Sequence, residues 1–176
     1  MPMPIRSRSG SARVGMVEAS TEPCRLVRVV LDAESIGFGT PDQKHERLTA
    51  IDDLLEANRF AIPGHDGGPY GLFLSIREAR LVFNVRTEAG EPVVVHLLSL
   101  RPLRRLLEDY MLICDSYVAA IRSASPAQIE AIDMGRRGLH NEGAERLMER
   151  LQGKIDADFA TMRRLFTLLF ALHWRG

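Results

Sequence analysis

The densest group of chemically capable side chains lies between residues 129 and 147. It comprises two adjacent arginines, a histidine, an asparagine and a glutamate: Arg136, Arg137, His140, Asn141 and Glu142. An imidazole titrates near neutral pH and can transfer a proton or bind a metal. A guanidinium binds carboxylate or phosphate through two parallel hydrogen bonds. These types favour a site with a histidine base, a glutamate partner and an arginine clamp for an anion.

Glycines interrupt this segment, and each costs a helix interior about 1 kcal/mol relative to alanine. We therefore expect one helix to end near Arg137 and the next to begin with Asn141 as its cap, with free backbone N–H groups for an anion. The competing interpretation is structural. In it Gly138 ends a helix, Asn141 caps the next, and His140 and Arg136 close a hydrogen-bond network.

A second candidate site lies in the glycine-rich loop at residues 64–69, where His65 and Asp66 are adjacent. Glycines let the backbone approach a ligand closely, and a neighbouring carboxylate can orient an imidazole. The same residues also suit a turn that leads into a strand. If the His65 and His140 segments meet in space, they form one joint site.

Spacing gives no support to a metal centre. The five histidines form no pair at helical spacing, and Cys24 and Cys114 are far apart in the chain. We predict no metal and no cofactor, because zinc-type, phosphate-loop and dinucleotide-binding patterns are all missing. Cys114 lies in the most apolar predicted helix, where a buried thiol is expected to be inert.

The charge balance argues against general binding to nucleic acid. The chain of 176 residues has 23 basic and 23 acidic side chains and therefore no formal net charge. A helix–turn–helix around residues 131–135 is disfavoured because Arg136 follows the glycine where an apolar residue belongs. The weaker alternative of an RNA-associated factor uses five arginines: Arg101, Arg104, Arg105, Arg163 and Arg164.

Composition predicts one domain. Residues 1–23 are rich in Ser, Pro, Gly and Arg without periodicity, so we expect a disordered tail followed by a single domain at residues 24–176. No apolar run follows the N-terminal arginines, which argues against a secretory signal. The apolar run from Leu165 to Trp174 is too short to span a membrane and suits a core helix or a two-fold interface. We expect a cytoplasmic protein with free thiols.

Hydrophobic periodicity predicts the order β-α-β-β-β-α-α-α-α. Strands are expected at residues 24–32, 70–76, 80–87 and 92–100, and the short links between the last three imply antiparallel neighbours. Helices are expected from Thr40 to about Asn58 and at residues 102–124, 125–137, 141–152 and 156–173. The fold class is α+β, with an antiparallel sheet of about four strands covered on one face by four to five helices.

Several phrases together resemble a known family. They are the runs at residues 64–70, 131–138, 139–143, 164–168 and 174–176. Through them the chain from residue 24 to residue 176 resembles a small bacterial family known as uncharacterised protein family 0262. The resemblance implies a single domain and carries over no catalytic or binding residue.

Three functional hypotheses remain after this reading. The first is a cytoplasmic, non-enzymatic binding or regulatory protein that forms homodimers. It is favoured by the missing catalytic spacing and the large helical apolar surface. The second is a small enzyme or ligand-binding domain for an anionic metabolite, with His65, Asp66, His140 and Glu142 as its reactive groups. The third is the RNA-associated factor.

Overall fold

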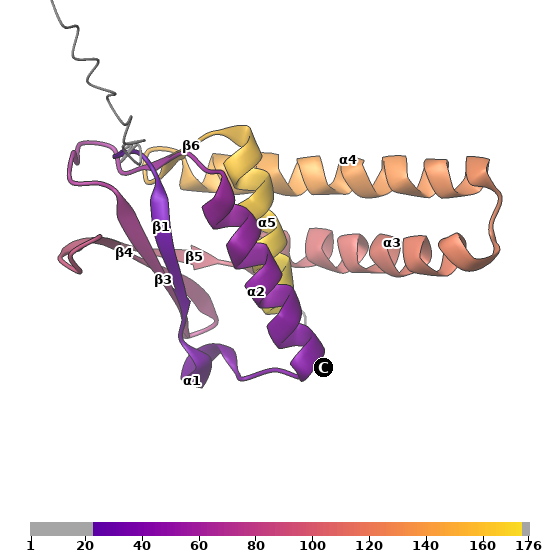
Figure 1. Cartoon of the computed structure of the whole chain (residues 1–176), viewed down its shortest axis with the longest axis horizontal. Coiled ribbons are helices and arrows are strands. Elements are labelled where there is room, and N and C mark those ends of the chain that lie inside the picture. Colours follow the sequence, from indigo (N-terminus) through magenta and orange to yellow (C-terminus); the bar gives the residue numbers. More distant parts are fainter. Residues whose placement is uncertain (1–22, 174–176) are drawn as a thin grey trace, which may run out of the picture.

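The computed structural model describes residues 23–173, so the predicted tail at residues 1–23 lies outside the described residues apart from Pro23. The elements, in order, are β1 (Leu26–Leu31), α1 (Ala33–Ile36), α2 (Pro41–Glu56), β2 (Phe60–Ala61), β3 (Tyr70–Arg77), β4 (Arg80–Thr87), β5 (Pro92–Ser99), the 3₁₀ helix η1 (Arg101–Leu103), α3 (Arg104–Ser123), α4 (Pro126–Leu151), β6 (Asp156–Ala157) and α5 (Phe159–His173). The α+β class is confirmed, and Figure 1 shows the arrangement.

Four strands form the main sheet in the order β1-β3-β4-β5. The meander β3-β4-β5 is antiparallel as predicted, and its β3–β4 turn holds Glu78 and Ala79 at positive φ of 50° and 60°. One pair differs from the prediction, because β1 runs parallel to β3. The long connection through α2 permits this pairing, whereas the short links constrained only the last three strands.

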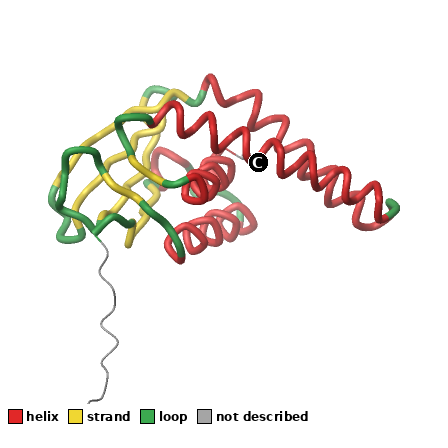
Figure 2. Tube along the Cα trace, turned by 90° about the horizontal axis from the view of Figure 1, so that it is seen from above, coloured by secondary structure: helices red, strands yellow, loops and turns green. Residues whose placement is uncertain are grey.

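The sheet has one covered face and one open face. Figures 1 and 2 show α2 and α5 on the covered side, between the sheet and the hairpin of α3 and α4. Leu72 and Leu74 of β3 and Phe83 of β4 are almost fully buried there. Val95 and Leu97 of β5 are exposed on the opposite face. Buried and exposed side chains thus lie on opposite faces of the sheet, which is the period-two pattern of a sheet with a single covered face.

The central element of the core is α5. Leu165, Phe166 and Leu168 are fully buried, and the helix packs against both α2 and α4. This confirms the core interpretation for residues 165–172 of the C-terminal apolar run, because their apolar side chains are largely covered within the chain. No helix among the described residues is long and apolar enough to cross a membrane.

Local signals placed two helix starts correctly. Thr40 and Gln43 form a complete capping box at the start of α2, with Pro41 in the first turn. Ser125 and Gln128 do the same at the start of α4. In each case the side chains satisfy backbone N–H groups that have no partner within the helix.

The predicted break at residues 138–140 is wrong. Residues 126–151 form one continuous helix, so Gly138 does not end a helix and Asn141 does not cap one. The two helices expected at residues 125–137 and 141–152 are therefore the single helix α4. The glycines are accommodated because α4 packs on α3 and α5 at close range, and such tertiary contacts outweigh a propensity cost of about 1 kcal/mol.

The three glycines of α4 differ in their surroundings. A Cβ on Gly143 would clash with the ring of Phe166, and one on Gly135 would lie 2.7 Å from Ile113 Cδ1. A Cβ on Gly138 would meet nothing within 4 Å. Gly143 and Gly135 therefore permit close helix contacts, whereas Gly138 has no such role.

We predict opposite effects for two matched substitutions in α4. Gly143→Ala should lower the free energy of unfolding by about 1–3 kcal/mol, because the added methyl group overpacks the contact with Phe166. Gly138→Ala should raise it by up to about 1 kcal/mol through helix propensity alone. Urea unfolding of both variants measures the difference, and a destabilised Gly138→Ala would contradict a continuous helix.

Candidate functional site

His140 lies within a half-buried cluster where α3, α4 and α5 meet. Its Nδ1 accepts a hydrogen bond from Arg163 Nη2 at 3.1 Å, and its Nε2 lies 3.0 Å from Arg163 O and 2.9 Å from Thr167 Oγ1. The ring stacks on Tyr110, with centroids 5.6 Å apart, and lies against Phe166. Both ring nitrogens are therefore already engaged within the protein.

This environment fixes the protonation state of His140. Because Nδ1 accepts from a guanidinium, the proton lies on Nε2 and the ring is neutral. Burial, followed by the charge of Arg163, lowers the pKa of the imidazole. Burial also raises the pKa of Tyr110 to about 12 and that of Cys114, so these neighbours stay neutral too. The cluster is a structural network, with Arg163 in the role that we had expected of Arg136.

The predicted arginine clamp already binds a carboxylate of the chain itself. Asp133 accepts from Arg136 Nη2 at 2.6 Å and lies 3.0 Å from Arg137 Nη2, so one carboxylate bridges both cations. These contacts hold the pKa of Asp133 below its usual range. Arg136 also lies over the ring of Tyr117, 5.0 Å from its centroid. An external anion would therefore compete with Asp133 for these two arginines.

Glu142 and Asn141 do not join His140. Successive residues of a helix turn by about 100°, so His140 and Glu142 point to nearly opposite sides of α4. Both Asn141 and Glu142 are exposed, and Glu142 pairs with Arg146 at 3.4 Å. The sequence neighbours that resembled an acid–base pair therefore face different environments.

The loop at residues 64–69 is held by its own hydrogen bonds. The backbone N–H of Gly67 donates to His65 Nδ1 at 3.1 Å, and the Tyr70 hydroxyl lies 3.0 Å from the same atom and from His65 O. A Cβ on Gly67 would clash with the imidazole, so the glycine allows this packing. Nε2 of His65 has no hydrogen-bond partner among the described residues and remains available.

His65 and Asp66 border a cleft of about 900 Å³ between this loop, the end of α4 and the segment that holds β6. We call it the acidic cleft. Cys24, Ile62, Met148, Ile155 and Met162 supply its apolar surface. Its charged groups are Arg59, Asp66, Glu145, Glu149 and Asp156. A concave, largely apolar surface with a few polar groups is typical of ligand sites.

Sequence reasoning found His65 and Asp66 but missed the residues opposite them. Glu145 and Glu149 occupy positions i and i+4 of α4, where like charges destabilise a helix by a few tenths of a kcal/mol. This unfavourable pair could have indicated, from the sequence alone, that this face of α4 belongs to a candidate site. Arg59 and Asp156 carried no local signal, because strand pairing of β2 with β6 brings them together across the chain.

The joint site is not formed. The acidic cleft contains His65 and Asp66 but none of Arg136, His140 and Glu142. Among the described residues, no group of three or more His, Cys, Asp or Glu side chains is placed to hold a metal ion. Arg163 is one of the five arginines that the RNA hypothesis needs. Its guanidinium donates to His140 instead.

We predict that His140→Gln loses about 1–3 kcal/mol of stability at pH 7.5, because it leaves the Arg163 guanidinium and Thr167 poorly satisfied. Since the folded pKa of His140 lies below its unfolded value of about 6.5, its contribution is present above that pH and is lost as the pH falls. The stability gap between variant and wild type should therefore narrow from pH 7.5 to pH 5. Exposed His45→Gln on α2 is the control, and a gap independent of pH would contradict the assignment.

Comparison with known proteins places the chain among bacterial relatives. It is 59% identical over 161 residues to a UPF0262 protein of Methylobacterium radiotolerans, covering 92% of this chain and 100% of the relative. It is 62% identical over 159 residues to a UPF0262 protein of Brucella anthropi, covering 90% of this chain and 99% of the relative. A third, from Agrobacterium fabrum, is 60% identical over 152 residues, covering 86% of this chain and 96% of the relative.

No solved structure matches the chain. The family model described as "Uncharacterised protein family (UPF0262)" matches residues 23–175. That range leaves out nearly all of the predicted tail and agrees with the resemblance drawn from the sequence. The chain therefore belongs to the bacterial family UPF0262, whose members have no assigned function.

Proposed function

We propose that this protein is a non-enzymatic binding protein of the cytoplasm whose ligand carries a positive charge on a partly apolar body. The acidic cleft is the proposed binding site. One observation carries the proposal: four carboxylates and one arginine surround an apolar surface within a cleft of about 900 Å³. The volume lies within the range of about 300–1,000 Å³ that small-molecule sites occupy.

The charges in the acidic cleft are unbalanced. Arg59 Nη2 pairs with Asp156 Oδ2 at 3.2 Å, so its charge is already matched. The other three carboxylates, Asp66, Glu145 and Glu149, have no ion pair with a described residue. Their combined field favours a cation and opposes an anion, because three exposed carboxylates of the same charge border one cleft. This arrangement supports a cationic ligand instead of the anionic metabolite expected at His65.

The remaining features of the acidic cleft suit binding more than catalysis. His65 offers Nε2 as a hydrogen-bond partner, and its ring is held by Tyr70 and Gly67. Met148, which is partly exposed, adds a flexible apolar contact that adapts to ligand shape. The cytoplasmic placement is supported by Cys24 and Cys114, which are both free thiols and suit a reducing compartment.

A pair of probes with the same body and opposite charge tests the proposal. Isothermal titration calorimetry should detect benzylammonium binding to the intact protein, whereas benzoate should show no binding that Glu145→Gln with Glu149→Gln alters. The double variant Glu145→Gln, Glu149→Gln should weaken benzylammonium binding at least about tenfold, which corresponds to about 1.4 kcal/mol. The variant should fold well, because it removes a like-charge pair from α4.

Glu130→Gln is the matched control, since Glu130 is exposed on the same helix and lies outside the acidic cleft. It should leave benzylammonium binding unchanged. Equal binding of benzoate at this cleft, or full affinity in the double variant, would refute the proposal. Turnover of any substrate that depends on His65 or His140 would refute its non-enzymatic part.

A specific feature also favours self-association. Helices α3 and α4 form an antiparallel hairpin that projects from the body (Figures 1 and 2), and we call its part beyond residues 111 and 139 the hairpin arm. Of the described residues from 111 to 139, only Ala120 is buried. Val118, Ile121 and Met134 are exposed large hydrophobic residues of the arm. The two helices of the arm bury few apolar side chains between them. They would gain stability by pairing with a second hairpin to form a four-helix bundle.

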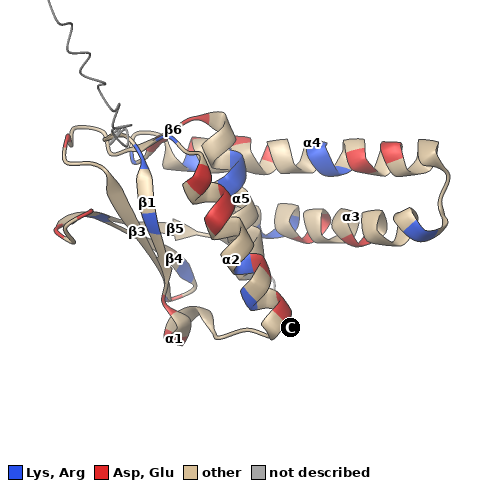
Figure 3. Cartoon of the chain, viewed as in Figure 1, with Lys and Arg blue, Asp and Glu red and all other residues tan. Residues whose placement is uncertain are grey.

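The charges of the arm support a second copy as the partner. Asp115 and Arg122 flank Val118 on the same side of α3, and neither has an ion pair with a described residue. In an antiparallel, two-fold pair centred near Val118, Asp115 of each protomer lies opposite Arg122 of the other. Figure 3 shows the far half of α3 as mostly uncharged, with a basic residue near its tip. Complementary ends around an apolar centre would fix the register.

Charge reversal tests this homodimer. Analytical ultracentrifugation should find a concentration-dependent dimer for the wild type, and Asp115→Arg or Arg122→Asp alone should weaken it at least about tenfold through two new repulsions. The double reversal should restore dimerisation. A wild type that stays monomeric at all concentrations, or a double reversal no better than either single variant, would contradict the antiparallel pairing.

A further inference from the structure

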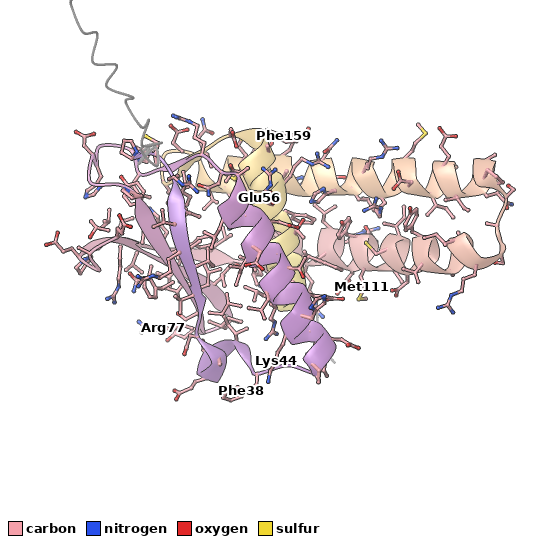
Figure 4. The ribbon with its side chains drawn as sticks, in the orientation of Figure 1. Phe38, Lys44, Glu56, Arg77, Met111 and Phe159 are labelled. Carbon is pink, nitrogen blue, oxygen red and sulfur yellow. The ribbon has the colours of Figure 1, made fainter. Side chains whose placement is uncertain are left out.

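A second cleft, of about 570 Å³, lies where the end of β5 leads into α3. Its lining comes from the β3–β4 turn, the start of α3 and one residue of α5. Figure 4 labels Arg77 at the end of β3 and Met111 on α3, the two elements that border it. We call it the arginine cleft, and it shares no residue with the acidic cleft.

The inner surface of the arginine cleft is apolar. Ile76, Leu100, Leu107, Met111 and Phe170 line it. Leu107 is almost fully buried and belongs to the core, whereas Ile76, Leu100 and Phe170 are partly buried side chains packed against that core. The apolar surface is therefore backed by the core and suits contact with a hydrocarbon group.

The rim of the arginine cleft is basic. Arg80, Arg101 and Arg104 border it, and Glu108 is the one acidic residue of its lining. Glu108 is already matched, because its Oε1 accepts from Arg104 Nε at 3.0 Å. Arg80 and Arg101 have no ion pair with a described residue. Two guanidinium groups thus remain for an anion at the mouth of an apolar cleft.

The start of α3 adds to this positive field. The helix is 20 residues long and begins without a side-chain cap and without an acidic residue in its first turn. Arg104 and Arg105 occupy that turn instead, although cations are unfavourable at the positive end of the helix dipole. A bound anion would offset both the dipole and the arginines.

We propose that the arginine cleft binds an amphipathic monoanion, an organic carboxylate attached to an apolar body. Arg80 and Arg101 would hold the carboxylate, and Met111 and Phe170 would contact the body. The site is independent of the acidic cleft. The proposal places an anionic ligand at the start of α3. The sequence had instead suggested that Arg136 and Arg137 of α4 hold the anion.

Three probes separate charge from apolar contact. Decanoate, decyltrimethylammonium and acetate, each below its micellar concentration, are titrated into the intact protein by calorimetry. Decanoate should bind at least about tenfold more tightly than acetate, because only it covers the apolar surface. Decanoate binding should also weaken as salt is added, because screening reduces the attraction of its carboxylate to the arginines.

Matched variants locate the decanoate site. Arg80→Gln with Arg101→Gln should weaken decanoate binding at least about tenfold, while Arg28→Gln, at an exposed arginine of β1 outside the lining, should leave it unchanged. Glu145→Gln with Glu149→Gln should also leave it unchanged, which separates this site from the acidic cleft. Two results would overturn the proposal. One is decanoate affinity that is retained in the Arg80 and Arg101 variant. The other is decyltrimethylammonium that binds as tightly as decanoate and whose binding is weakened by none of these variants.

Discussion

The close crossing of α4 over α5 at Gly143 is the contact on which the rest of the molecule depends. The missing Cβ lets the Phe166 ring lie directly against the α4 backbone. This contact fixes α4 on the central helix of the core and so determines where both of its halves lie. The near half borders the acidic cleft, and the far half extends as the hairpin arm. A side chain at residue 143 would push the helices apart and alter both surfaces together.

The same crossing brings His140 into a hydrogen-bond network with α5. One turn before Gly143, the helices are still close enough for the imidazole to reach Arg163 and Thr167 of α5. A buried polar group is costly unless it is hydrogen-bonded, and here donor and acceptor are matched on both ring nitrogens. Such a network favours one rotation of α4 over its neighbours. These hydrogen bonds from His140 to α5 thus help to hold the hairpin in position.

Charge is neutral over the whole chain and uneven over its surface. The acidic cleft gathers carboxylates from three separated segments, whereas the arginine cleft gathers guanidinium groups at the start of α3. The two separate clefts therefore present opposite fields on one small molecule. Neither field is visible in the net charge, which is zero.

Sequence alone determined the features that depend on local chemistry. Capping residues at Thr40 and Ser125 set two helix starts, and alternation with short links set the meander β3-β4-β5. Tertiary structure decided the rest. The glycines of α4 signalled a break by their propensity, but packing against Ile113 and Phe166 keeps the helix whole. The acidic cleft likewise joins His65 to Glu145 and Asp156, because a site made by non-local contacts has no signature in any one stretch of sequence.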